Sequence, residues 1–99
     1  YIHQGDSIDC VTLDLSFISL LKVIDTVKSL LSSGGYCITL IKPQFEADLG
    51  QVPKGGVITD TLLHRNIVNS VVEKISAHGF DCKGVVDSPI LGTAGNREF

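Results

Sequence analysis

Two apolar segments separated by a helix-like stripe constrain the fold of this chain more than any other feature. The segments run from Cys10 to Leu15 and from Tyr36 to Lys42, and their composition is typical of buried strands. Between them, apolar residues recur at helical spacing on one face, namely Leu20, Ile24, Val27 and Leu31. A strand, a helix and a second strand predict two parallel strands joined by a helical crossover.

Residues typical of helix ends lie between these segments, as the predicted helical crossover requires. Ser16 is expected to cap the first helix, and the Ser-Ser-Gly-Gly run at 32–35 is expected to end it. A long connection then spans residues 43–58. Connections of this length in compact domains are often functional.

The second half of the chain repeats the alternation. A helix is predicted from Thr59 and Asp60 to Gly79, with an apolar stripe formed by Leu63, Ile67, Val71 and Ile75. A third strand is predicted from Phe80 to Val86, followed by a loop and a further element that begins at Glu98. The whole order predicts an α/β fold with a mostly parallel sheet.

Composition narrows the class of protein. The chain has 99 residues, enough for one domain or a part of one, and it is 43% hydrophobic and 19% charged, as globular proteins are. A net charge of -3 supplies no basic face for nucleic acid from this segment alone. No apolar run approaches the roughly 20 residues of a membrane span, and no signal peptide opens the chain. We therefore expect a cytoplasmic protein that does not contact membranes, and the absence of methionine suggests a fragment of a longer chain.

The three cysteines indicate neither disulfides nor zinc. The number of cysteines is odd, and no two of them have C-x-x-C spacing; they are Cys10, Cys37 and Cys82. We therefore interpret them as reduced core thiols of a cytosolic protein. No other ligands cluster near them, and no metal site is predicted.

Lys42 is the first candidate for chemistry. It ends the second predicted strand, and open α/β sheets bind ligands beyond the carboxyl ends of their strands. Burial lowers the pKa of a lysine, which makes a neutral amine available as a base. Asp14 lies near the end of the first strand, and neighbouring parallel strands are about 4.8 Å apart. The spacing therefore fits either a proton-transfer site or an ordinary ion pair at the sheet edge.

Other polar residues have weaker patterns. His3, His64 and His78 have no partner at metal or triad spacing, and His78 suits the C-terminal end of a helix. The Lys54-Gly55-Gly56 run offers backbone amides to a phosphate, but it lacks a Walker spacing, so a flexible loop is the better interpretation.

Four ordered blocks carry a family resemblance. They are Asp-Leu-Ser-Phe-Ile-Ser-Leu at 14–20, Ile-Lys-Pro-Gln-Phe-Glu at 41–46, Ser-Pro-Ile at 88–90 and Gly-Asn-Arg-Glu-Phe at 95–99. Together they resemble the TlyA-type family of FtsJ-like ribosomal RNA 2'-O-methyltransferases, whose members are often called hemolysin A. The resemblance runs from about Asp9 to Phe99.

The resemblance implies methylation of a cytidine ribose in ribosomal RNA, with S-adenosylmethionine as cofactor and ribosomal RNA or a ribosomal subunit as partner. It implies a partial Rossmann-like S-adenosylmethionine-dependent methyltransferase fold behind a small S4 RNA-binding domain. The matching motifs make Asp14, Lys42 and Glu98 members of a Lys-Asp-Lys-Glu catalytic tetrad. Lys42 would take the proton of the ribose hydroxyl, Asp14 and Glu98 would hold the lysine, and Asp14 would also contact the cofactor weakly.

Several parts of the family pattern have no match in this sequence. They are the first tetrad lysine, the glycine-rich cofactor loop, the acidic residue that binds the cofactor ribose, and the S4 domain. Residues 1–99 are therefore expected to be the C-terminal part of the methyltransferase domain. Alone, the chain is expected neither to bind cofactor tightly nor to methylate RNA. Because its first strand would be an apolar edge, it is expected to self-associate or to need its missing N-terminal half.

Two other classes of function stay open. One is a membrane-lytic hemolysin, which the lack of a spanning segment, a basic amphipathic helix and a signal peptide disfavours. The other is a non-catalytic RNA- or protein-interaction module with a degenerate methyltransferase fold. Glu46 also has two interpretations: it orders the loop after Lys42, or it pairs with Lys54.

Overall fold

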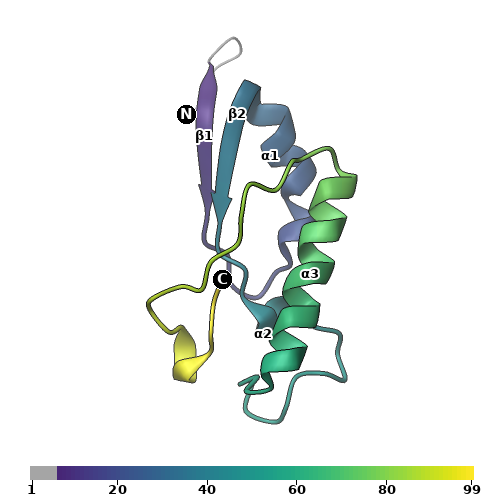
Figure 1. The fold of residues 1–99 in the computed structure, drawn as a ribbon, viewed down its shortest axis with the longest axis vertical. Helices are drawn as coiled ribbons and strands as arrows, with labels where there is room; N and C mark the ends of the chain where they lie inside the picture. Colours follow the sequence, from purple (N-terminus) through teal and green to yellow (C-terminus); the bar gives the residue numbers. More distant parts are fainter. Residues whose placement is uncertain (1–6) are drawn as a thin grey trace.

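The computed structural model describes residues 7–99 and contains a pair of parallel strands with helices beside it (Figure 1). β1 (Ile8–Leu13) pairs in parallel with β2 (Leu31–Thr39). The chain passes between them through η1 (Leu20–Lys22) and α1 (Ile24–Leu30). The predicted α/β class, with a parallel sheet and a helical crossover, is confirmed.

Three helical segments follow β2. They are α2 (Pro43–Glu46), α3 (Thr61–Ala77) and η2 (Thr93–Gly95). α3 is the helix predicted from its apolar stripe, and it begins where expected, because the Asp60 carboxylate accepts hydrogen bonds from the first N–H groups of the helix. In Figure 1, α1 and α3 lie to the same side of the strand pair.

Both strands begin and end earlier than their apolar runs predicted. Cys10 pairs with Tyr36 as expected for adjacent strands, but the register shifts between Ile8 and Cys10. The glycines at 34 and 35, expected to end a helix, instead form an irregularity inside β2, where Gly34 has a φ of 81°. A backbone with positive φ costs glycine little, so the strand can continue through this bulge.

The strand predicted from Phe80 to Val86 is not formed. These residues follow α3 and run beside β2 (Figure 1), but a groove of about 1000 Å³ lies between the two segments. A strand needs a neighbour whose backbone groups pair with its own. Because no described strand reaches residues 80–86, their apolar residues do not produce a ladder.

The hydrophobic core lies between α3 and the segments at the carboxyl ends of the strands. Its buried members are Leu20, Ile41, Ile58, Ile67, Val68 and Val71. The predicted stripe of α3 supplies two of them and also packs Leu63 and Ile75 against the cluster. The core therefore fixes the backbone immediately before Lys42.

The interpretation of the cysteines as core thiols is wrong for two of them. Cys10 and Cys82 are exposed, because Cys10 lies on an uncovered face of the sheet and Cys82 lies in the unpaired segment after α3. Cys37 is half-buried, and burial, followed by the neighbouring Cys10, raises the pKa of its thiol. All three are free.

No helix within residues 7–99 has the length and apolar character needed to cross a membrane.

We expect the isolated chain to self-associate, because each strand has one unpaired edge in the described part of the chain. One sheet face also exposes Tyr36 and Ile38, at 59% and 61%. Thr12 lies opposite Ile38 in the sheet register. A Thr12→Lys substitution should therefore lower the association constant measured by sedimentation equilibrium.

Ser76→Lys, on an exposed position of α3, adds the same charge away from the sheet and should leave association unchanged. A monodisperse monomer of 10.6 kDa that unfolds cooperatively would contradict this prediction.

Candidate active site

Asp14 and Lys42 meet at the carboxyl ends of the two strands. Asp14 directly follows β1, and the ladder continues one step beyond β2 through a hydrogen bond from the Leu40 N–H to the Leu13 carbonyl. The Lys42 Nζ atom lies 2.6 Å from Asp14 Oδ1. The lysine side chain is 13% exposed and the aspartate is 69% exposed, so the amine is partly withdrawn from solvent while the carboxylate faces it.

Ser16 is a further partner of this lysine. Lys42 Nζ donates to Ser16 Oγ at 3.3 Å. Ser16 was expected to cap the first helix, and this is wrong. Ser19 caps η1 instead, because its hydroxyl accepts from the Leu21 N–H.

Glu98 reaches the same edge through the backbone. The Ile41 N–H donates to the Phe99 carbonyl at 2.6 Å, and the Phe99 N–H donates back to the Ile41 carbonyl at 2.9 Å. This exchange defines an antiparallel hydrogen-bonded pair, so the next pair outward is Lys42 and Glu98. Residues opposite each other in such a pair present their side chains on one face.

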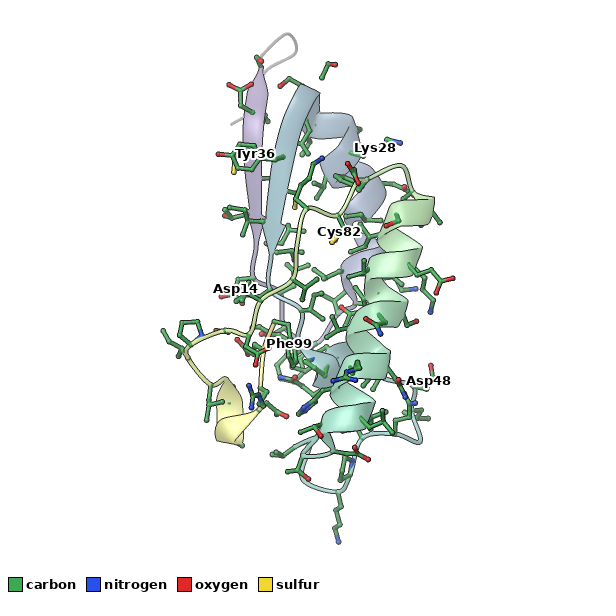
Figure 2. All side chains as sticks on the ribbon, viewed as in Figure 1. Asp14, Lys28, Tyr36, Asp48, Cys82 and Phe99 are labelled. Carbon is green, nitrogen blue, oxygen red and sulfur yellow. The ribbon has the colours of Figure 1, made fainter. Side chains whose placement is uncertain are left out.

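The Glu98 carboxylate itself lies against Gly92, where any Cβ would collide with it. Within residues 7–99 it makes no ion pair with Lys42. The structure therefore joins Asp14 to Lys42 directly and places Glu98 beside them by backbone pairing. Figure 2 shows Asp14 at the end of β1 and Phe99 on the side toward α3.

An aromatic pair lies next to this site in the sequence, and one of its two rings is exposed. Phe17 is 90% exposed, and its ring centroid lies 5.0 Å from that of Phe45 at an interplanar angle of 52°. Phe17 also has a φ of 62°, which is rare for a bulky residue and costly without local support. Phe17 was not among the site residues predicted from the sequence, although Phe17 and Phe45 belong to two of the four blocks.

Glu46 connects the same two blocks. Its Oε2 accepts from the Ser19 hydroxyl at 2.5 Å, and its Oε1 accepts from the Leu20 N–H at 2.7 Å. It therefore orders the segment after Lys42 by tying it to the segment after β1. In the described part of the chain, Glu46 forms no ion pair with Lys54.

A buried amide holds the loop that carries Glu98. Asn96 is 5% exposed, and its side chain accepts from the Ile58 N–H at 3.1 Å and donates to the Gly56 carbonyl at 2.9 Å. His64, which is buried, donates through Nε2 to the Ile58 carbonyl at 2.8 Å. The long connection and the Glu98 loop are thus fastened together.

The remaining histidines and the glycine run do not join the site. His78 Nδ1 lies 2.6 Å from Asp25 Oδ1, at the end of α3 away from the strand ends, and His3 lies outside the described residues. Gly55 and Gly56 adopt positive φ in an exposed turn. No group of three or more potential metal ligands was found among residues 7–99.

Comparison with known proteins identifies related chains. Residues 2–99 match the family model of the FtsJ-like methyltransferases. "Hemolysin A" of Brachyspira hyodysenteriae is 43% identical over 86 residues, which cover 87% of this chain and 36% of that protein. The "16S/23S rRNA (cytidine-2'-O)-methyltransferase TlyA" of Mycobacterium tuberculosis (strain ATCC 25618 / H37Rv) is 39% identical over 95 residues, covering 96% of this chain and 35% of that protein.

A solved structure agrees with this relationship. The crystal structure of "a putative hemolysin from Lactococcus lactis" superimposes with a TM-score of 0.90 and 38% sequence identity. The superposition covers 98% of the present chain and 46% of the Lactococcus lactis chain. The chain spans about a third of the length of the curated relatives described above, at 36% and 35%.

We predict that Asn96→Ala lowers the free energy of unfolding by about 1–3 kcal/mol, because it leaves the Ile58 N–H and the Gly56 carbonyl without their partner. Urea denaturation of the protein measures this change. Asn69→Ala, an exposed amide on α3, serves as the matched control and should stay within about 0.5 kcal/mol of the parent. Equal losses for the two variants would show that the buried amide has no special role.

Proposed function

Because the chain belongs to the FtsJ-like methyltransferase family, we propose that it carries part of the active site of an S-adenosylmethionine-dependent ribosomal RNA (cytidine) 2'-O-methyltransferase. The observation that carries this proposal is the 2.6 Å contact between Lys42 and Asp14 at the ends of neighbouring parallel strands. The Rossmann-like fold of such enzymes fits the parallel strands and their crossover. The name of the mycobacterial relative supports cytidine as the substrate.

Lys42 is proposed to take the proton of the ribose 2'-hydroxyl. Its side chain is largely withdrawn from solvent, and its Nζ atom is held by Asp14 and Ser16. Removing this proton makes the ribose oxygen a better nucleophile, and a positioned base contributes through both proton transfer and orientation. Asp14 stabilises the positive charge that Lys42 gains, and Glu98, opposite Lys42 in the backbone pairing, is proposed to do the same.

Asp14 also suits a cofactor that carries positive charge. One of its oxygens binds Lys42, and the side chain is 69% exposed, so the carboxylate can attract a cation from the solvent side. S-adenosylmethionine supplies the methyl group for the reaction when it is bound. We propose that the rest of the cofactor pocket, the first tetrad lysine and an S4 RNA-binding domain belong to other parts of a longer protein.

In this proposal, residues 1–99 form the C-terminal part of the methyltransferase domain, and the chain alone is inactive. The limited share of its relatives that the chain covers supports this division. The substrate would be ribosomal RNA or a ribosomal subunit, which places the enzyme in the cytoplasm.

The aromatic pair is proposed to contact the RNA. RNA-binding proteins stack unpaired bases on exposed aromatic side chains. Phe17 offers such a ring one residue after Ser16, which Lys42 contacts, and the Phe45 ring lies against it. A base stacked on Phe17 would bring its own ribose close to the lysine.

We predict that Lys42→Ala in the full-length enzyme lowers the rate of methyl transfer to ribosomal RNA by roughly 100-fold or more, the usual contribution of a general base. Lys42→Arg should be similarly impaired, because a guanidinium keeps the charge beside Asp14 but does not give up its proton. Incorporation of labelled methyl groups into ribosomal RNA measures the rate.

Lys74→Ala, at an exposed position of α3, is the control and should keep full activity. Unchanged activity of Lys42→Ala would remove this lysine from its proposed role. Inactivity of the full-length protein itself would instead favour a non-catalytic interaction module.

We predict that Phe17→Ala raises the KM for RNA by roughly fivefold or more, because stacking on an aromatic ring contributes about 1–3 kcal/mol per base. Phe17→Asn separates this effect from backbone strain, since asparagine tolerates positive φ but offers no ring. Both variants should show the same loss in steady-state methyl-transfer kinetics.

Leu62→Ala removes another exposed apolar side chain, 62% exposed on α3, and should leave KM unchanged. A normal KM for Phe17→Asn would mean that no base stacks on this ring.

A further inference from the structure

Glu46 has no part in the chemistry proposed above, yet it links the two segments that supply it. We name these segments the rim segments: residues 14–20, after β1, and residues 42–46, which lead into and include α2. The two segments contact each other through the Asp14–Lys42 ion pair, the Ser16–Lys42 hydrogen bond, the tilted pair of phenylalanine rings and the two hydrogen bonds of Glu46.

The sheet and the core fix the first rim segment at Asp14, Leu15 and Leu20. Asp14 follows a residue that still belongs to the β ladder, and Leu20 is buried at 2% exposure. Between them, Ser16, Phe17 and Ile18 are all exposed. The Ser16–Lys42 hydrogen bond is exposed, and it holds this stretch only weakly because water competes for both of its partners.

Phe17 nevertheless adopts a left-handed backbone conformation. Such a conformation in a bulky residue persists only where the surroundings over-determine it. Glu46 supplies a constraint close to this residue: both of its carboxylate oxygens accept short hydrogen bonds in a part-buried position, one from the Ser19 hydroxyl and one from the Leu20 N–H. Charge-assisted bonds of this kind are stronger than neutral ones.

The two hydrogen bonds of Glu46 constrain Phe17 in two ways, through its own backbone and through the ring that it contacts. Ser19 follows Phe17 by two residues, and Phe45, which carries the Phe17 ring, immediately precedes Glu46. Releasing Glu46 therefore frees both the backbone that aims Phe17 and the ring that supports it, while the sheet still holds Asp14.

We propose that Glu46 is a positioning residue, which holds Phe17 in its left-handed conformation and so prepares the RNA-stacking surface beside Lys42. This inference rests on the proposed function, because it assigns Glu46 to RNA binding rather than to methyl transfer itself. It predicts that losing Glu46 impairs KM for RNA much more than kcat.

The test uses steady-state methyl transfer by the full-length enzyme. Glu46→Ala should raise KM for ribosomal RNA by roughly fivefold or more, approaching the effect of Phe17→Ala, with kcat reduced less than about threefold. Glu46→Gln should restore most of the parent KM, because its amide oxygen can accept from the Leu20 N–H and its NH₂ group can donate to Ser19 Oγ.

A double-mutant cycle separates positioning from general destabilisation. If Glu46 acts through Phe17, then adding Glu46→Ala to Phe17→Ala should raise KM no further, since interacting residues are not additive. Additive effects of the two substitutions would overturn the proposal, as would an unchanged KM in Glu46→Ala.

Asp60→Ala is the matched control for stability. Asp60 is also a carboxylate that accepts two hydrogen bonds, but both come from backbone N–H groups of α3, which it caps. It should lower the melting temperature while leaving KM unchanged. Should Glu46→Ala fail to fold, Ser19→Ala removes the Oε2 bond together with the Ser19 cap of η1 and leaves the bond from the Leu20 N–H to Oε1. It should raise KM in the same direction, and a parent-like KM there would count against the proposal.

The outcomes distinguish this inference from the function on which it rests. A fully active Lys42→Ala enzyme would refute the proposed site, whatever Glu46 does. An inactive Lys42→Ala enzyme together with a raised KM in Phe17→Ala and a normal KM in Glu46→Ala would refute the positioning role alone.

Discussion

The burial of Ile41 beneath α3 is the constraint on which the candidate site depends. Ile41 is 5% exposed within the core, and an aliphatic side chain buried to this extent contributes about 1.5–3 kcal/mol. Its backbone also exchanges both hydrogen bonds with Phe99. Because successive residues of an extended chain point to opposite sides, fixing Ile41 inward turns Lys42 to the other side of the chain, where its Nζ atom contacts Asp14.

The same core also fixes the backbone of two other segments around Lys42. Leu20 and Ile58 have their side chains in this core, and the backbone N–H of each donates a hydrogen bond to a polar side chain. The Leu20 N–H donates to Glu46, and the Ile58 N–H donates to Asn96. Apolar burial therefore fixes where the backbone lies, and carboxylate or amide side chains then set the loops that surround Lys42. A single ion pair such as Asp14 and Lys42, whose carboxylate is 69% exposed, contributes about 0–1 kcal/mol where solvent reaches it and would not by itself hold these loops.

The local sequence pattern is sufficient for the elements whose contacts are near in sequence. The apolar stripe and the cap at Asp60 predict α3, because the helix satisfies its own backbone groups within a few residues. The order of strand, helix and strand predicts a parallel pair, and that order brings Asp14 and Lys42 to one edge. The four blocks predict the FtsJ-like family, which is confirmed.

What only the tertiary structure decided involves partners far apart along the chain. The hydrogen bonds of Glu46 to Ser19 and Leu20 span 27 and 26 residues. No local sequence pattern could predict that Glu46 binds these residues and not Lys54, which is closer in the sequence. The same reason explains residues 80–86, whose composition suits a strand but which have no described neighbour to pair with. The sequence by itself determined the strand, helix and strand order of the first half, the helix α3, the family and the residues at the strand ends. Long-range packing and backbone pairing decided how those residues face one another, because their energies depend on partners that come together only in the folded chain.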